Sequence, residues 1–144
     1  MNVLFLFGPN LGALERRDPE TYGKETLEEI MSGVEQRGTE LGHAVAWVQS
    51  DHEGELVGRL LGARDDGFGA VVLNAGALSH YSYALRDAVE ACGIPVLEVH
   101  MTNIYAREEF RRHSVISEVC RGVIAGLGAG GYHQALEALR WITP

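Results

Sequence analysis

The stretch 70–99, AVVLNAGALSHYSYALRDAVEACGIPVLEV, contains a complete strand–helix–strand unit and decides the fold. It begins with the apolar run Ala70–Leu73 and ends with Val96–Val99, and both runs are short, aliphatic and free of polar alternation. Such runs are typical of parallel strands buried on both faces. Between them, Ser82 can cap a helix that ends near Cys92–Gly93. The unit therefore predicts two parallel strands joined by a right-handed crossover.

Apolar runs of the same kind recur along the chain and alternate with stretches of helical period. The further predicted strands are Val3–Phe7, Ala44–Val48 and Val123–Ala125. Five strands that alternate with helices predict an α/β fold with a doubly wound parallel sheet in three layers. The preferred topology is the flavodoxin-like strand order 2-1-3-4-5. We expect one domain over residues 1–144, because no linker, repeat or low-complexity segment interrupts the pattern.

Three more helices are expected outside the opening unit. Thr26 and Glu29 have the spacing of a capping box at the start of a helix near residue 27. Ser50 and Glu53 repeat that spacing ahead of the next apolar-periodic stretch. A last helix is predicted over Tyr132–Trp141.

The composition excludes several classes of protein. The chain has 144 residues, 46% of them hydrophobic, which is enough to build a core without disulfides. A net charge of −8 argues against a nucleic-acid surface. No apolar run approaches the roughly 18 residues of a membrane span, and the N-terminus lacks a signal-peptide pattern. The two cysteines, Cys92 and Cys120, are too few for a disulfide framework and suggest a reducing, cytoplasmic location.

The connection Gly8–Gly23 is unusually long for a loop between a strand and a helix. Such loops commonly have about 2–6 residues, and those beyond about 12–15 are often lids or binding loops. This one has no apolar periodicity. We predict a lid, with a disordered insertion as the alternative.

Polar side chains follow the predicted strands at the edge where open α/β sheets bind ligands. In chain order they are Asn10, Arg17, Tyr22, Asn74, His80, Glu98, His100, Thr102, Arg107 and Arg111. Their spacing matches no metal-binding or nucleotide-binding motif. The set predicts a site for a polar, hydroxylated, anionic small molecule and for acid–base chemistry.

Two arrangements within this set suit proton transfer. Glu98 and His100 are two positions apart on an extended segment, so their side chains share a face and can hydrogen-bond as in a general acid. The alternative is a structural ion pair. Tyr22 is a weak base as a free phenol, but Arg17 and Arg107 could favour its phenolate.

Several longer motifs resemble those of the type II 3-dehydroquinate dehydratases. They are FGPNLG at 7–12, RRDPETYG at 16–23, QSDHEGEL at 49–56, VLNAGALSHYSYALRDA at 72–88, PVLEVHMTNIYAREEFRRHS at 95–114 and GVIAGLGAGGYHQALEAL at 122–139. The resemblance implies a homododecamer, a tetramer of trimers, without metal or organic cofactor. It also implies the reversible anti-elimination of water from 3-dehydroquinate to 3-dehydroshikimate, in the shikimate pathway to aromatic amino acids or in quinate metabolism.

The resemblance assigns catalytic roles to Tyr22, His100, Arg17, Asn10, Glu98 and Arg107. The tyrosine would remove a C2 proton while the two arginines hold its phenolate. The asparagine would position a water that stabilises the enolate. The histidine, oriented by the glutamate, would protonate the departing C1 hydroxyl.

Substrate-binding roles fall by the same resemblance on Asn74, His80, Asp87, Met101, Thr102 and Arg111. The backbone amides of residues 101 and 102 would take the substrate carboxylate. Asp87 would approach the site of a neighbouring subunit.

The chain also departs from the family pattern at positions that affect lid kinetics and affinity rather than the reaction. These positions are Glu15, Asp51, Ala75, Tyr81 and Tyr105. Two other functions stay open: a non-catalytic flavodoxin-like binding module for a small carboxylate, and a homologous dehydratase of a related cyclic hydroxy-ketone acid. Lys24 is the only lysine, which argues against the lysine Schiff base of the unrelated class of dehydratase.

Overall fold

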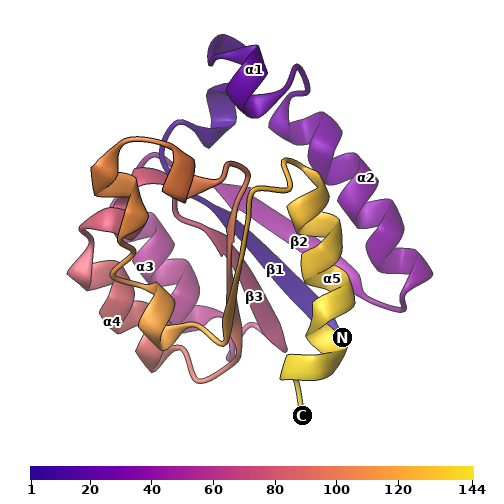
Figure 1. The fold of residues 1–144 in the computed structure, drawn as a ribbon. Coiled ribbons are helices and arrows are strands. Elements are labelled where there is room, and N and C mark those ends of the chain that lie inside the picture. Colours follow the sequence, from indigo (N-terminus) through magenta and orange to yellow (C-terminus); the bar gives the residue numbers. More distant parts are fainter.

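A five-stranded parallel sheet forms the centre of the molecule (Figure 1). The computed structural model describes residues 1–144. The strands are β1 (Asn2–Phe7), β2 (Ala44–Gln49), β3 (Ala70–Asn74), β4 (Val96–His100) and β5 (Gly122–Ala125). They pair in the order β2-β1-β3-β4-β5, and every pair is parallel. The predicted α/β class and the flavodoxin-like order 2-1-3-4-5 are therefore confirmed.

Helices cover both faces of the sheet and complete the three layers (Figure 1). The longer ones are α2 (Leu27–Glu40), α3 (Glu53–Gly62), α4 (Tyr83–Ala91) and α5 (Gly130–Ile142). Helices α2 and α5 pack on one face, and α3 and α4 pack on the other. Shorter helical segments occur at the ends of the strands: η1 (Leu11–Arg16), α1 (Pro19–Tyr22), η2 (Gly76–His80), η3 (Ile104–Ala106), η4 (Glu109–Arg112) and η5 (Ser117–Val119).

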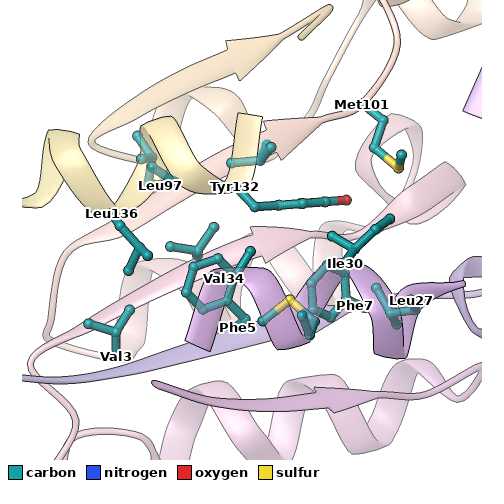
Figure 2. Packing of buried hydrophobic residues seen from close by; sticks show 14 of the residues in the cluster. Val3, Phe5, Phe7, Leu27, Ile30, Val34, Leu97, Met101, Tyr132 and Leu136 are labelled. Atoms are coloured by element: carbon teal, nitrogen blue, oxygen red, sulfur yellow. The ribbon is translucent and has the colours of Figure 1, made fainter. Parts of the chain in front are cut away.

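The alternation of side chains along β1 divides the core into two clusters. Phe5 and Phe7 point toward α2 and α5, while Leu4 and Leu6 point toward α3 and α4. In the first cluster the ring of Tyr132 meets that of Phe7 edge to face at 5.3 Å (Figure 2). Burying each such side chain contributes about 1.5–3 kcal/mol to the free energy of folding. The core therefore holds the ends of the strands in fixed positions.

The edge strands differ from the prediction that all five strands are buried on both faces. Strands β1, β3 and β4 are almost entirely buried, whereas β2 and β5 are partly exposed. Val123 in β5 is 45% exposed. The prediction is wrong for these two strands because each has a neighbouring strand on one side only.

Two of the three predicted helix caps are present. The Thr26 hydroxyl accepts the Glu29 amide at 3.2 Å, and the Ser82 hydroxyl accepts the Leu85 amide at 3.0 Å. The predicted Ser50 cap is wrong: its hydroxyl accepts the amide of His52, the residue that directly precedes α3. The Ser50 amide still donates to Phe7 on β1, so this serine continues the strand pairing and lies too early to cap the helix.

The segment Gly8–Gly23 is more ordered than a loop without periodicity predicts. It contains η1 and the single turn α1, and Leu11 and Leu14 are buried in the core. The Asp18 side chain caps α1 by accepting the Glu20 amide at 3.1 Å. The alternative of a disordered insertion is therefore wrong, and the two leucines were missed because two apolar residues form no detectable period.

Candidate active site

A cavity of about 110 Å³ lies at the carboxyl ends of the central strands, where the predicted polar residues meet. The predicted site residues that line this cavity are Asn10, Arg17, Tyr22, Asn74, His80, His100, Met101, Thr102, Arg107 and Arg111. Glu98 lies behind His100 and does not line the cavity. Asp87 is exposed on α4 and is not among the lining residues. The fold thus brings ten of the twelve predicted residues to one cavity.

A larger open groove, of about 590 Å³, lies between α4, the start of β4 and the C-terminal residues. Its lining includes apolar side chains and Arg121 but no histidine, tyrosine or asparagine. Its carboxylates, Glu90 and Glu118, have no imidazole or phenol beside them in this lining, so size alone does not make it the reactive site.

The Glu98–His100 pair forms the most buried polar part of the site. Strand β4 carries both residues on one face, and the predicted hydrogen bond is present, with 2.6 Å between His100 Nε2 and Glu98 Oε1. Burial raises the pKa of Glu98, but hydrogen bonds from His100, Ser117 and Ser114 outweigh it and hold the pKa below its usual value. The carboxylate is therefore ionised at neutral pH and accepts the hydrogen bond from His100 as a charged acceptor.

His80 lies directly beside this pair. Its ring stacks on that of His100, with centroids 6.2 Å apart and planes at 18°. Burial lowers the pKa of His80, although the hydrogen bond to the carbonyl oxygen of His113, at 2.8 Å, acts in the opposite direction. With Nδ1 donating to that carbonyl, the Nε2 of a neutral His80 is left as an acceptor.

Tyr22 is held at its phenolic oxygen by two guanidinium groups from different segments. Arg17 donates to it at 2.6 Å and Arg107 at 2.7 Å. Arg17 also lies over the tyrosine ring, 3.9 Å from its centroid. Two cationic donors from different parts of the chain therefore meet at one phenolic oxygen. The predicted convergence of these three residues is confirmed.

Asn10 adopts a left-handed backbone conformation, with a φ of 70°, which is the only positive φ outside glycine. The backbone amide of Asn10 donates to Asp51 Oδ1 at 2.9 Å, and the side-chain Nε2 of Gln49 donates to the same oxygen at 3.1 Å. Gln49 also donates to the carbonyl of Gly8 at 3.1 Å. Asp51, two residues beyond the end of β2, thus anchors the loop that carries Asn10.

Asn74 is fixed by contacts that sequence reasoning did not include. Its Nδ2 donates to the Tyr132 hydroxyl at 2.8 Å, and its Oδ1 accepts the Gly76 amide at 3.1 Å. Tyr132 is fully buried, and burial raises the pKa of its phenol well above the ordinary value. It is therefore a neutral partner that orients Asn74.

The cavity is positively charged in an otherwise acidic chain. Arg17, Arg107 and Arg111 line it, whereas the net charge of the chain is −8. Arg111 also pairs with Glu108, one turn away. Three arginines suit an anionic ligand. No group of three or more His, Cys, Asp or Glu side chains is arranged to hold a metal ion, and no helix is both long and apolar enough to span a membrane.

The supporting residues missed from the sequence come from remote segments. Ser114 and Ser117 precede β5, and Tyr132 lies in the first turn of α5. Ser114 and Tyr132 lie within the motifs quoted above and Ser117 lies between two of them, but no local pattern indicates their partners, Glu98 and Asn74, which are 16 to 58 residues away.

A flavodoxin-like α/β fold with an acid pair, an arginine-bound tyrosine and a cationic cavity defines an enzyme class that moves protons on small anions. The chain matches the family model described as Dehydroquinase class II over residues 1–140. It belongs to the class II dehydroquinase family.

Its relatives and structural neighbours carry the same description. A 3-dehydroquinate dehydratase of Thermus thermophilus is 54% identical over 137 residues, covering 95% of this chain and 92% of the relative. The type II dehydroquinase from Propionibacterium acnes has a TM-score of 0.92 at 46% identity, covering 96% of this chain and 94% of that one. That from Butyrivibrio crossotus has a TM-score of 0.94 at 38% identity and covers 97% of both chains.

Proposed function

We propose that the protein is a 3-dehydroquinate dehydratase, a carbon–oxygen hydro-lyase that converts 3-dehydroquinate reversibly to 3-dehydroshikimate through an enolate. The observation that carries the proposal is the presence of the Tyr22–arginine group and the His100–Glu98 pair at one cavity. Family membership and relatives named 3-dehydroquinate dehydratase support the choice of substrate.

The first step is removal of a proton from C2, next to the ketone. Tyr22 acts as the base in its phenolate form, which Arg17 and Arg107 stabilise through their hydrogen bonds of 2.6 and 2.7 Å. The electron pair of the broken C–H bond moves into the enolate, whose oxygen needs a hydrogen-bond donor. Asn10 positions a water for that purpose.

The second step is loss of the C1 hydroxyl. His100 donates its proton to this oxygen, the C–O bond breaks, and the enolate electrons form the C1–C2 double bond of the product while water departs. Glu98 prepares the histidine by stabilising its protonated form. The proton leaves and the hydroxyl departs on opposite faces of the ring, which makes the elimination anti. The enzyme ends with a neutral tyrosine and a neutral histidine, and the reverse reaction starts from that state.

The remaining lining residues bind the substrate. The backbone amides of Met101 and Thr102, which follow β4, take the carboxylate, and Arg111 adds positive charge. Asn74 and a neutral His80 hydrogen-bond the ring hydroxyls. These roles use only side chains and amides, so activity should survive treatment with a metal chelator.

We also propose that the segment Gly8–Gly23 acts as a lid. It carries Asn10, Arg17 and Tyr22, so its docking completes the base side of the site and excludes water. The lid and the cavity belong to a single domain of residues 1–144.

The direct test measures the rise in enone absorbance when purified protein is mixed with 3-dehydroquinate. Turnover by the wild-type protein, with almost none by Tyr22→Phe, supports the proposal. Binding of the substrate without turnover would instead indicate a non-catalytic binding module. Faster turnover of another cyclic hydroxy-ketone acid would indicate a dehydratase with a different substrate.

The assembly and cellular setting are further parts of the proposal. The resemblance supports a homododecamer, a tetramer of trimers, in which the exposed Asp87 approaches a neighbouring subunit's site. Light scattering combined with size-exclusion chromatography measures the mass, and a monomer that turns over as fast as the assembly would rule out this role. We propose a cytoplasmic location, which the free cysteines Cys92 and Cys120 suit, and a role in aromatic amino acid biosynthesis or quinate metabolism.

A further inference from the structure

The short segment His113–Ser117 contacts Glu98, the partner of His100, and also contacts His80, on the sides of these residues that face away from the cavity. Ser114 Oγ donates to Glu98 Oε1 at 2.8 Å, and the Ser117 hydroxyl hydrogen-bonds the other carboxylate oxygen, Oε2. The carbonyl oxygen of His113 lies 2.8 Å from Nδ1 of His80. One segment therefore reaches the partner of His100 and also the ring that stacks on it.

The hydrogen bonds around Ser114 favour one direction for its proton. Its Oγ accepts the Ser117 amide at 3.3 Å, so its single O–H is free to donate to Glu98. Together with His100 and Ser117, this surrounds the carboxylate of Glu98 with three donors. Such a set satisfies an ionised carboxylate better than a protonated one, since a protonated group would need an acceptor.

Packing holds the segment in this position. Val115 and Ile116, between the two serines, are buried in the cluster under α3 and α4. The Val115 amide donates to the Ser79 carbonyl at 2.8 Å, and Arg86 of α4 donates to the Val115 carbonyl at 2.8 Å. The serine hydroxyls therefore approach Glu98 from a backbone that is tied to two other elements.

We propose that Ser114 and Ser117 are positioning residues that keep Glu98 ionised and thereby keep the acid proton on His100. In the same arrangement burial keeps the stacked His80 uncharged, and the His113 carbonyl fixes its remaining proton on Nδ1. Two imidazolium rings 6.2 Å apart would repel each other, so one ring serves as the acid and the other as an acceptor. This inference rests on the proposed function, in which His100 protonates the leaving hydroxyl.

The other titratable groups near Glu98 do not compete for this role. Cys120, beyond η5, has its pKa raised to about 12, by burial first and by the charge of Glu98 second. It stays a neutral thiol at neutral pH. Arg111, from η4, faces His80 and helps to lower the pKa of that histidine. The remaining facing group, His80 from η2, is itself uncharged.

The test compares Ser114→Ala, Ser117→Ala and the double variant with Ser114→Thr and Ser117→Thr, which keep the hydroxyl. Ser32→Ala, at an exposed position on α2, is the matched control. Nitrogen NMR of labelled histidines in the free enzyme follows the pH at which His100 loses its proton, with the signal assigned from a His100→Gln spectrum. We expect less imidazolium at His100 in each alanine variant, seen on the acid side of the titration as nitrogen shifts closer to those of a neutral ring, and least imidazolium in the double variant. The threonine variants and the control should titrate like the wild type.

A second readout separates positioning from stability. The value of kcat should fall in parallel with the loss of the imidazolium signal, while KM at the optimum stays within about twofold. Alanine variants that lower only the melting temperature and titrate like the wild type would overturn the proposal. If the double variant does not fold, each single variant decides the question alone. The NMR titration needs no turnover, so its failure is distinguishable from failure of the proposed dehydratase activity.

Discussion

The two sides of the cavity that we propose to supply the acid and the base are built in different ways. Glu98 and His100 lie on β4, between two other strands, with side chains 0% and 6% exposed. Tyr22 lies in the single turn α1, is only partly buried, and depends on Arg17 and Arg107 from two separate segments. Figure 1 shows α1 beyond the end of the sheet, away from its central layers.

This difference predicts different consequences of mutation. The acid side belongs to the core, so losing a partner there leaves buried polar groups unsatisfied and lowers stability. The base side is assembled when the segment Gly8–Gly23 docks, so losing a partner there affects chemistry and leaves the fold intact. Comparing turnover with unfolding free energy in the same variants tests this division.

The largest effect on turnover should come from removing either proton-transfer group. Tyr22→Phe and His100→Ala should each lower kcat by about a hundredfold or more, the usual contribution of a general acid or base. The phenylalanine variant should keep its unfolding free energy within about 0.5 kcal/mol, because the lost hydroxyl faces the cavity and not the hydrophobic core. Steady-state kinetics and urea unfolding measure both quantities. Near-wild-type rates in either variant would contradict the assigned mechanism.

The next largest loss of turnover should come from removing an arginine that donates to the Tyr22 hydroxyl. Arg17→Ala should lower kcat strongly, by about tenfold to a hundredfold, because one of the two donors to the phenolic oxygen is lost. Arg16→Ala, at the neighbouring exposed arginine, is the matched control and should behave like the wild type. Wild-type turnover in Arg17→Ala would rule out a catalytic lid, and equal loss in both variants would indicate a general charge effect.

The central fold follows from local signals that the tertiary structure reinforces. The unit 70–99 has aliphatic runs, a serine cap and a glycine stop, and each appears in the structure as β3, Ser82, Gly93 and β4. The pair Glu98–His100 was accessible for the same reason, since alternation along a strand sets which side chains share a face.

Other parts could not be predicted because they depend on distant contacts. Ser50 has the spacing of a helix cap, yet its amide bonds to Phe7 of β1 and holds it at the end of β2, too early to cap the helix. Leu11 and Leu14 are buried only because η1 docks on the core. The serines that contact Glu98 lie 16 and 19 residues beyond it, and nothing local to them indicates a buried carboxylate as partner.

A smaller effect, on stability, should appear at Glu98. Glu98→Gln keeps the shape but leaves donors from His100, Ser114 and Ser117 without a charged acceptor, and should cost about 2 kcal/mol of unfolding free energy at pH 7. The pKa of Glu98 is lower in the folded protein than in the unfolded chain, so its contribution is complete above the ordinary value of about 4.3 and is lost as pH falls through the folded value.

Denaturant unfolding of wild-type and variant protein between about pH 7 and pH 3 measures this loss. The difference between the two should be constant down to about pH 5 and shrink below pH 4. A difference that persists unchanged in acid would indicate that the carboxyl group is already protonated at neutral pH, and the acid side would then lack its charge.

The smallest effect is expected at Lys24, two residues from the base. Lys24 is exposed and does not line the cavity, so it cannot reach a bound ketone as a nucleophile from the position it occupies. Borohydride traps a Schiff base irreversibly, whereas an enolate mechanism offers it no covalent adduct. Enzyme treated with borohydride during turnover of 3-dehydroquinate should keep the activity of enzyme treated without substrate, and Lys24→Arg should behave identically. Substrate-dependent inactivation with added mass on Lys24 would show that this amine, and not the Tyr22 phenolate, reacts with the substrate. The comparison between a buried acid and a lid-borne tyrosine base would then be wrong.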